Sequence, residues 1–245
     1  MKKDFVRKGV FVLKTVNIWQ TIQDLVINCE PSPGLFNPYS DSHPEWDLPD
    51  APSIRTDNLK NYLDDHGRND HQRGIDLLLV AEAPGPWGCR FSGVPITSEA
   101  QLLNVEFPAR GRQSTRREVP FSEYSASIYW RILAPYYSTI FTWNTVPWHP
   151  YRSGKPDSIR TPRQAEINQF LPVLEAVVSW AGPRKIVAVG RKAENALGRI
   201  GATAEYVRHP SQGGARIFET GVLNILEELN VQPIHNQTSS ERAVR

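Results

Sequence analysis

The sequence predicts an α/β protein, a three-layer α/β/α sandwich around a mostly parallel four-stranded sheet. Four short apolar runs rich in β-forming residues alternate with helical patterns, as expected for a parallel sheet covered on both faces. The 245-residue chain is 40% hydrophobic, which suits one sizeable domain. The four runs are IDLLLVAE (75–82), STIFTWNTV (138–146), RKIVAVG (184–190) and AEYVRH (204–209).

The N-terminal segment, residues 1–52, is expected to pack on the main domain as a helix followed by a proline-rich wrap. Helical spacing of apolar residues predicts the helix over about 16–28. Prolines crowd residues 31–52 and disfavour regular elements there. The main domain is expected over 53–232 and a loose polar tail over 233–245. Large apolar residues give the wrap groups to bury, so it is predicted to be ordered; they are Leu35, Phe36, Tyr39 and Trp46.

The clearest helix of the main domain is predicted between the second and third apolar runs. Thr161 can cap it, Pro162 suits its first turn, and Gln164 completes a capping box. Gly182 and Pro183 end it. Its apolar stripe consists of Ile167, Phe170, Leu171, Leu174 and Val178.

Composition excludes several classes of protein. The formal net charge of +2 is too small to indicate a polyanion partner, so any nucleic-acid partner must be argued from local charge. Cys29 and Cys89 cannot form a disulfide framework, and no acidic or cysteine ligand set accompanies His66 and His71. We therefore expect no metal and no other cofactor. Lysines interrupt the apolar residues of segment 1–19, so no signal peptide or membrane span is predicted, and a cytoplasmic location is expected.

Polar residues stand where three of the four predicted strands end. Glu82 follows the first strand in AEAPG, Asn144 ends the second in WNTVP, and His209 follows the fourth in HPSQGG. A buried core needs none of these side chains. Because the carboxyl ends of parallel strands lie on one edge of a sheet, the three residues should converge there as a site.

These residues resemble the uracil-DNA glycosylase superfamily. AEAPG at 81–85 is similar to its first motif, Asn144 to its later strand-end asparagine, and HPS at 209–211 to its second motif. The resemblance runs from about 75 to 229. It implies an α/β/α sandwich around a four-stranded parallel sheet. The chain has too few cysteines for the iron–sulfur cluster that branches with GEAPG often carry.

The resemblance assigns roles to the three strand-end residues. A neutral His209, together with backbone N–H groups of the AEAPG turn, would stabilise the negative charge that develops on the departing pyrimidine. Asn144 would read the Watson–Crick edge of a flipped base, although rotation of its amide leaves uracil and cytosine both open. Glu82 is the nearest candidate for orienting the attacking water. Ala83 stands where the GQDPYH branch has an aspartate, so the general-base role of that branch is not carried over directly. Outside the resemblance, Glu82 can also be a solvated residue, His209 a structural histidine and Asn144 a turn cap.

The wall of the expected base pocket departs from the family pattern. Gly85 stands where GQDPYH has the tyrosine that rejects a methyl group on carbon 5, and Ile96 stands where many relatives have a stacking phenylalanine. Both changes predict a wider pocket. Ala83 belongs to the same turn, and Trp87 or Phe91 is the candidate for the missing aromatic face.

Two segments are candidates for contacts with DNA. Four arginines in residues 108–119 can bind phosphates or form an ordinary solvated surface. In the HPSQGG loop, glycines allow close approach to the minor groove, and Gln212 holds the position of the wedge residue of relatives. The full set of predicted DNA-binding residues is Arg110, Arg112, Arg116, Arg117, Ser211, Gln212, Gly213 and Arg216.

The sequence thus favours a monofunctional DNA glycosylase acting on uracil or another altered pyrimidine and leaving an abasic site. Its partner would be DNA with a flipped pyrimidine, and it would act as a monomer without an obligate protein partner. One alternative is removal of hypermodified 5-substituted cytosines from phage DNA, an antiviral defence. Another is a catalytically silent DNA-binding member of the fold. An unrelated hydrolase or nucleotide-binding protein is disfavoured, because the sequence has no GxSxG, GxxxxGK[ST] or strand-linked GxGxxG motif.

Overall fold

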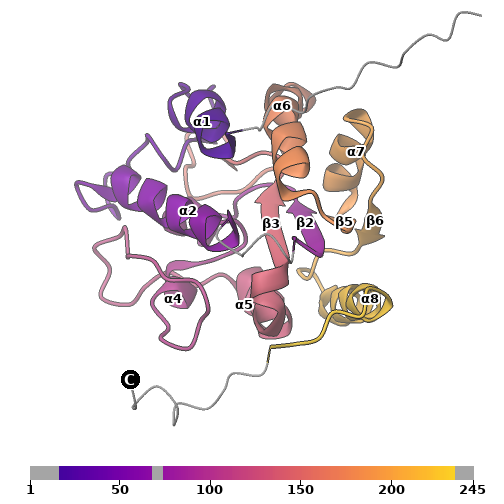
Figure 1. Cartoon of the computed structure of the whole chain (residues 1–245). Coiled ribbons are helices and arrows are strands. Elements are labelled where there is room, and N and C mark those ends of the chain that lie inside the picture. The colour runs from indigo at the N-terminus through magenta and orange to yellow at the C-terminus, as the bar shows by residue number, and fades with distance from the viewer. Residues whose placement is uncertain (1–16, 68–73, 235–245) are drawn as a thin grey trace, which may run out of the picture.

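The computed structural model describes residues 17–67 and 74–234 and is built around a four-stranded parallel sheet (Figure 1). The strand order is β3-β2-β5-β6. All five residues of β2 and of β3 are buried, which matches the unbroken apolar sequence of β2 and the mainly apolar sequence of β3. All four predicted strands are confirmed, as β2 (Leu77–Ala81), β3 (Ile140–Asn144), β5 (Lys185–Val189) and β6 (Glu205–Val207).

Helices cover both faces of this sheet, which confirms the predicted three layers. Figure 1 shows α6 and α7 on one side of the sheet and α5 and α8 on the other, with α2 beside edge strand β3. Phe141 of β3 packs on Trp180 of α6, whereas its neighbour Thr142 bonds Tyr129 of α5, because successive strand residues point to opposite faces. These helices are α2 (Ala51–Gly67), α5 (Tyr124–Leu133), α6 (Gln164–Ala181), α7 (Arg191–Arg199) and α8 (Ala215–Glu228).

The N-terminal segment packs against the domain. The predicted first helix is α1 (Ile18–Ile22) followed by a π-helical turn, η1 (Gln23–Ile27). In the proline-rich wrap, Leu35, Phe36 and Tyr39 are buried. One short element was not predicted: β1 (Leu35–Phe36) pairs antiparallel with β4 (His149–Pro150). Helix α2 begins at Ala51 and so runs across the expected boundary at residue 52.

The start of α6 differs from its prediction. The helix begins at Gln164, and Arg163 rather than Thr161 is its N-cap residue. Glu166 accepts a hydrogen bond from the backbone N–H of Arg163 at 2.7 Å and forms an ion pair with Arg160, also at 2.7 Å. This ion pair holds the Glu166 carboxylate where it caps the helix, two residues later than expected. Gly182, with φ +48°, ends the helix as predicted.

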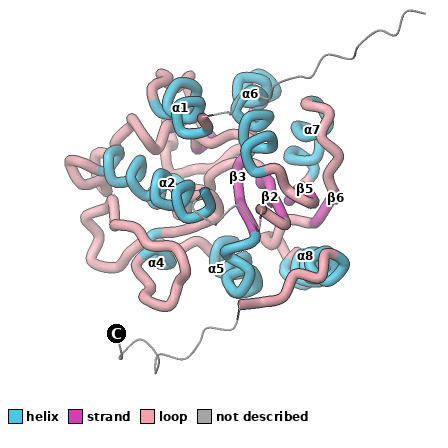
Figure 2. Tube along the Cα trace, in the orientation of Figure 1, coloured by secondary structure: helices cyan, strands magenta, loops and turns pink. Residues whose placement is uncertain are grey.

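A long segment between β2 and α5 contains little regular structure (Figure 2). Its short helices are α3 (Cys89–Ser92) and α4 (Glu99–Leu102), and the 3₁₀ helix η2 (Ala134–Thr139) follows α5. The fully buried Glu99 organises this segment, since its carboxylate accepts hydrogen bonds from the backbone N–H groups of Ser114 and Thr115 at 2.7 and 3.0 Å. One buried carboxylate therefore holds the later part of the segment against α4.

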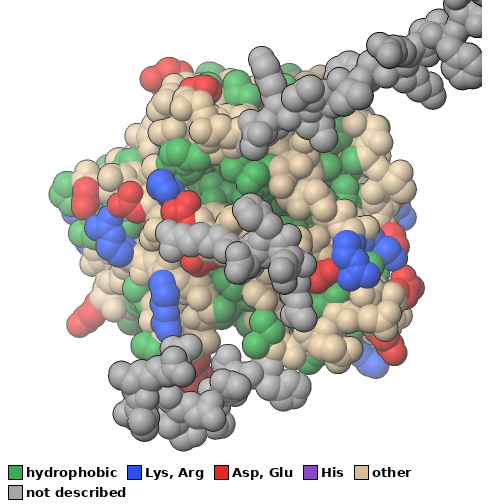
Figure 3. All heavy atoms as spheres, in the orientation of Figure 1, with side chains coloured by type: hydrophobic (Ala, Val, Ile, Leu, Met, Phe, Trp, Pro, Cys, Tyr) green, Lys and Arg blue, Asp and Glu red, His purple; other side chains and the backbone are tan. Residues whose placement is uncertain are grey.

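Charges on the surface are largely matched. On the face drawn in Figure 3, acidic and basic side chains lie next to each other. Lys185, for example, pairs with both Glu205 and Glu228, at 2.5 and 2.8 Å. In the described part of the chain, no helix has the length and apolar character needed to cross a membrane.

Candidate functional site

The three strand-end residues lie at the carboxyl edge of the sheet. Asn144 ends β3 beside Ala81, the last residue of β2, and Glu82 follows directly. His209 follows the end of β6 by two residues. Because β5 lies between β2 and β6, and strands are about 4.8 Å apart, the β6 end lies roughly 10 Å along the edge from Glu82. The structure thus brings Glu82 and Asn144 side by side and leaves His209 further along the same edge.

The amide of Asn144 is buried and only partly bonded. The residue is 2% exposed, and its Nδ2 donates to Sγ of Cys89 at 3.7 Å. Its Oδ1 is buried and accepts no hydrogen bond from the described residues. A buried carbonyl oxygen without a donor is unfavourable and uncommon in folded proteins. The amide oxygen is therefore available to a donor brought by a ligand.

Glu82 is half-buried at the start of the turn that follows Ala81. Burial raises the pKa of its carboxyl group above the ordinary value, and the positive charge of Lys192 in the first turn of α7 opposes part of that shift. Its side chain makes no hydrogen bond to the part of the chain that the structure describes. A carboxyl group with a raised pKa and no fixed partner can accept a proton from a bound water.

The ring of His209 is oriented by the serine two residues later. The Ser211 hydroxyl lies 2.8 Å from Nδ1, and the Ser211 backbone N–H donates to the same nitrogen at 3.2 Å. A nitrogen that accepts from a backbone N–H carries no proton, so in the neutral ring the proton is on Nε2. Burial lowers the pKa of His209, which favours this neutral form. The site therefore contains a neutral imidazole whose Nε2–H can donate.

The turn after β2, residues 82–88, is held by its carbonyl groups. The two residues after β3 donate backbone hydrogen bonds to the carbonyls of Ala81 and Glu82, at 2.8 and 3.0 Å. Nδ1 of the fully buried His149 lies 2.8 Å from the carbonyl oxygen of Pro84. These contacts fix the turn against the chain that follows Asn144.

The N–H groups of the same turn are not used in this way. Among the described residues, none accepts a hydrogen bond from the backbone N–H of Ala83, Gly85 or Gly88. Ala83 and Gly85 are half-buried, so their N–H groups border the edge that holds Asn144. A turn with bound carbonyls and free N–H groups is suited to stabilising negative charge.

The space beside Gly85 is occupied by a residue that the sequence reasoning missed. The carboxylate of Glu123 lies so close to Gly85 that a Cβ at position 85 would overlap both of its oxygens, and a Cβ at Gly88 would lie 2.7 Å from Oε2. The wider pocket expected from Gly85 is therefore not found on this side. Glu123 is 38 positions from Gly85 in the sequence, so no local pattern could have indicated the contact.

The two aromatic candidates for the base-stacking face differ in exposure. Phe91 is fully buried, with its ring 4.5 Å from Phe121 and the Arg90 guanidinium 4.8 Å from its centroid. It belongs to the core in this structure. Trp87 is half-buried and packs on Phe121 at 5.1 Å. Trp87 is therefore the candidate that a base can reach.

Ile96 has an unusual backbone conformation. Its φ is +47°, a region that β-branched residues rarely adopt because of clashes with Cβ. Trp130 helps to hold this conformation by donating from Nε1 to the Ile96 carbonyl at 2.7 Å. Such strain costs on the order of 1–3 kcal/mol and is concentrated at functional sites. The side chain is half-buried, so it remains available to a ligand.

Three of the four arginines of segment 108–119 bind other parts of the protein. Arg112 forms an ion pair with Asp57 of α2 at 2.6 Å. Arg110 donates to the carbonyl of Asn104 at 2.9 Å, and Arg116 donates to a carbonyl of the proline-rich wrap at 3.0 Å. These contacts direct the three guanidinium groups towards α2, the preceding loop and the wrap.

Arg117 stacks on an aromatic ring that the turn also contacts. Its guanidinium is 4.3 Å from the ring centroid of Phe121 and 5.2 Å from that of Trp46. Trp87 of the turn packs on the same Phe121 ring. Arg117 is therefore the member of the arginine segment that the structure brings next to the candidate site.

The HPSQGG loop has a constrained backbone. Gln212 is exposed with φ +52°, and Gly213 follows with φ +76°. Any side chain at Gly214 would overlap the carbonyl of the loop's histidine, so glycine is required there. Arg216, in the first turn of α8, is exposed. The loop thus presents Gln212 outward on a left-handed backbone.

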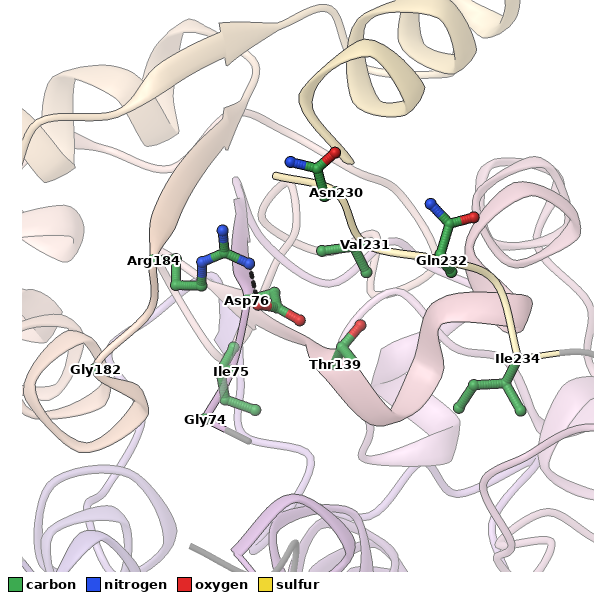
Figure 4. Close-up of a pocket in the computed structure, with 10 residues that line it drawn as sticks. All are labelled: Gly74, Ile75, Asp76, Thr139, Gly182, Arg184, Asn230, Val231, Gln232 and Ile234. Atoms are coloured by element: carbon green, nitrogen blue, oxygen red, sulfur yellow. Dashed lines mark hydrogen bonds and ion pairs between the residues drawn. The ribbon is translucent and has the colours of Figure 1, made fainter. Parts of the chain in front are cut away.

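A hollow of about 440 Å³ lies at the opposite edge of the sheet (Figure 4). Asp76 and Thr139, which precede β2 and β3, line it, and Asp76 forms an ion pair with Arg184 at 2.8 Å. Parallel sheets bind ligands at their carboxyl edge, so this hollow is not the candidate site. No cluster of potential metal ligands occurs within 17–67 and 74–234; both ring nitrogens of His66 face backbone carbonyls, and His71 is outside the described residues.

Comparisons with known proteins agree with this fold. A family model described as the uracil DNA glycosylase superfamily matches residues 108–228, which include Asn144 and His209 but not the turn after β2. The crystal structure of wild-type SMUG2 from Pedobacter heparinus aligns with a TM-score of 0.57 at 11% sequence identity, covering 88% of this chain and 99% of that one. No curated protein matches the sequence.

The fold and the matched segment define a protein of the DNA glycosylase class. Residues 108–228 match the uracil DNA glycosylase superfamily, which confirms the resemblance seen in the motifs of the chain.

Proposed function

We propose that the protein is a monofunctional DNA glycosylase that hydrolyses the N-glycosidic bond of a flipped pyrimidine and leaves an abasic site. The match to the superfamily supports glycosylase chemistry in general. The motifs AEAPG, WNTVP and HPS contain no lysine that would form a Schiff base with the sugar. Water is therefore the proposed nucleophile.

The observation that carries this proposal is the buried amide of Asn144. Its Oδ1 lacks a donor while its Nδ2 has only the weak acceptor Sγ of Cys89, at 3.7 Å. The Watson–Crick edge of a pyrimidine offers a donor and an acceptor side by side, which is the pattern that one amide can satisfy. A base in this position would remove the cost of the unpaired oxygen.

His209 and the free N–H groups of the turn supply the proposed driving force. Cleavage leaves negative charge on the departing pyrimidine, and donors aimed at that charge lower the barrier. The Nε2–H of neutral His209 and the backbone N–H groups of Ala83 and Gly85 lie on the same sheet edge. A pyrimidine held between β2 and β6 would receive hydrogen bonds from both sides.

Glu82 is the proposed residue for positioning water. It directly follows Ala81, the ladder partner of Asn144, and burial raises its carboxyl pKa. Burial raises the proton affinity of this carboxylate, so it accepts a hydrogen bond from water more strongly than an exposed carboxylate does.

One panel of oligonucleotides tests the function and the choice of base. Single- and double-stranded DNA carries one uracil, thymine mismatch, hypoxanthine, 5-hydroxymethylcytosine or glucosylated 5-hydroxymethylcytosine, and abasic sites are detected by alkaline cleavage. We expect cleavage of uracil DNA by the wild type. The matched variant His209→Ala should lower the rate by about two to three orders of magnitude, as for loss of one oxyanion donor, with little change in DNA affinity.

The other outcomes separate the alternatives. Cleavage confined to the 5-substituted cytosines would support the antiviral reading in place of uracil repair. Binding of DNA without cleavage of any member would contradict the proposed activity and identify a silent binding protein. An unchanged rate in His209→Ala would remove that residue from the site.

A further inference from the structure

A second buried acceptor lies beside the amide of Asn144. Glu123 precedes α5, and Ser125 donates from its hydroxyl to Oε1 at 2.7 Å. The other oxygen, Oε2, is buried and accepts no hydrogen bond from the described residues. Leaving a buried carboxylate oxygen without a donor is costlier than leaving a neutral carbonyl unpaired.

Glu123 and Asn144 approach neighbouring residues at the end of the turn and the start of α3. Asn144 contacts the Cys89 thiol at 3.7 Å. Gly88 directly precedes Cys89, and a Cβ at Gly88 would lie 2.7 Å from Oε2 of Glu123. The two unpaired oxygens, Oδ1 of Asn144 and Oε2 of Glu123, therefore lie on neighbouring parts of one wall.

Glu123 fills the volume that side chains at 85 and 88 would occupy. Neither Gly85 nor Gly88 has a positive φ, so a left-handed backbone does not explain glycine at either position. The close approach of the Glu123 carboxylate explains the absence of a side chain at both positions. The two glycines and Glu123 thus form one unit, in which the missing turn side chains are replaced by a carboxylate from another element.

We propose that Glu123 is a specificity-determining residue of the base pocket, where it presents a hydrogen-bond acceptor to the carbon-5 edge of the pyrimidine. This inference rests on the proposed function. Asn144 reads the ring positions up to the substituent on carbon 4, and carbon 5 is the next ring atom, so the wall beside Asn144 faces it. A methyl group there would bury an apolar surface against an unpaired carboxylate oxygen. Hydrogen fits, and a substituent carrying an O–H or N–H donor would pair with Oε2.

The experiment compares two substitutions at this position. Glu123→Ala removes both volume and charge, whereas Glu123→Met keeps the volume and removes the acceptor. Single-turnover excision is measured on uracil, thymine opposite guanine, and the 5-hydroxymethyl derivatives of uracil and cytosine. We expect both variants to raise thymine excision relative to uracil by at least about tenfold, and to lose any preference for the hydroxymethyl over the methyl substituent.

Two further variants show whether the carboxylate must be held in place. Ser125→Ala removes the donor to Oε1 and should give a smaller change in the same direction. Glu106→Ala removes an exposed glutamate of the same loop and should change no ratio. Thermal unfolding identifies any variant that fails to fold. If Glu123→Ala does not fold, the measurements on Glu123→Met and Ser125→Ala decide the test.

A binding measurement separates this inference from the proposed activity. Dissociation constants are measured for oligonucleotides whose 2′-fluoro sugar prevents cleavage, carrying the same bases. If the wild type cleaves uracil DNA but the thymine-to-uracil ratio is the same in every variant, Glu123 has no role in specificity and the activity stands. If no base is cleaved but affinity for the 5-substituted bases changes with Glu123, the inference stands and the activity does not. If no base is cleaved and no affinity changes with Glu123, both the proposed activity and this inference are wrong.

Discussion

The contacts with Ser211 determine which ring nitrogen of His209 can donate to a ligand. The Ser211 hydroxyl and backbone N–H both approach Nδ1, so the proton is left on Nε2. Replacing Ser211 by Ala removes one of these two contacts. We expect a loss of about fivefold in the single-turnover rate, as for one hydrogen bond of ~1 kcal/mol, without a change in DNA affinity.

The exposed Ser153 supplies the control for this substitution. Ser153→Ala should leave rate and affinity at wild-type values. A Ser211→Ala rate equal to that of the wild type would show that the backbone N–H alone fixes the ring.

Glu82 predicts the acid limb of the activity profile. If its carboxylate positions water, activity is lost as the group becomes protonated, and burial shifts that loss to a pH above the ordinary value of 4.5. We expect the rate to rise with pH through this raised pKa. In Glu82→Gln the rate should be low and its acid limb absent. A wild-type profile retained in Glu82→Gln would exclude the role in water activation.

At the level of secondary structure, the strands could be predicted and the helix starts only in part. Strand runs are local signals, since the four predicted runs are each only six to nine residues long. The start of α6 depended on an ion pair between Glu166 and Arg160, whose geometry local propensity does not reveal. The same holds for the site. Asn144 and His209 could be predicted because they stand at strand ends, whereas Glu123 is far from Gly85 in the sequence and contacts it only in the folded protein.

The arginine segment gives a prediction for DNA binding that distinguishes its members. Arg117 lies next to the turn and has no carboxylate partner among the described residues, whereas Arg112 is paired with Asp57. In Arg117→Ala the dependence of log affinity on log salt should be shallower by about 0.9, the value for one duplex phosphate contact. Arg112→Ala should leave the slope unchanged. If both variants keep the wild-type slope, neither arginine binds a DNA phosphate.

For the molecule as a whole, the histidines predict a loss of stability in mild acid. Burial lowers the pKa of His43, His66, His149 and His209, and that of His149 falls from 6.5 to about 4. The unfolded chain therefore binds protons that the folded protein excludes. Stability is complete above pH 6.5 and declines as the pH falls towards 4, with His149 alone contributing on the order of 3 kcal/mol.

Urea unfolding at pH 7.5, 6 and 5 measures this decline. His149→Gln should be less stable than the wild type at neutral pH, because His149 bonds the turn through the Pro84 carbonyl. Its stability should also change less between pH 7.5 and 5. Parallel curves for the two proteins would show that His149 does not carry the pH dependence.

The buried thiol of Cys89 makes opening of the turn accessible to chemical labelling. Cys89 is 3% exposed and its pKa is raised, so a maleimide can reach and react with it only when the turn separates from Asn144. Cys29 is half-buried and would react first, and Cys29→Ser removes that background. In such a variant the labelling rate measures how often the turn opens. A bound base would slow it, so the native sequence already contains a reporter of whether the site is occupied.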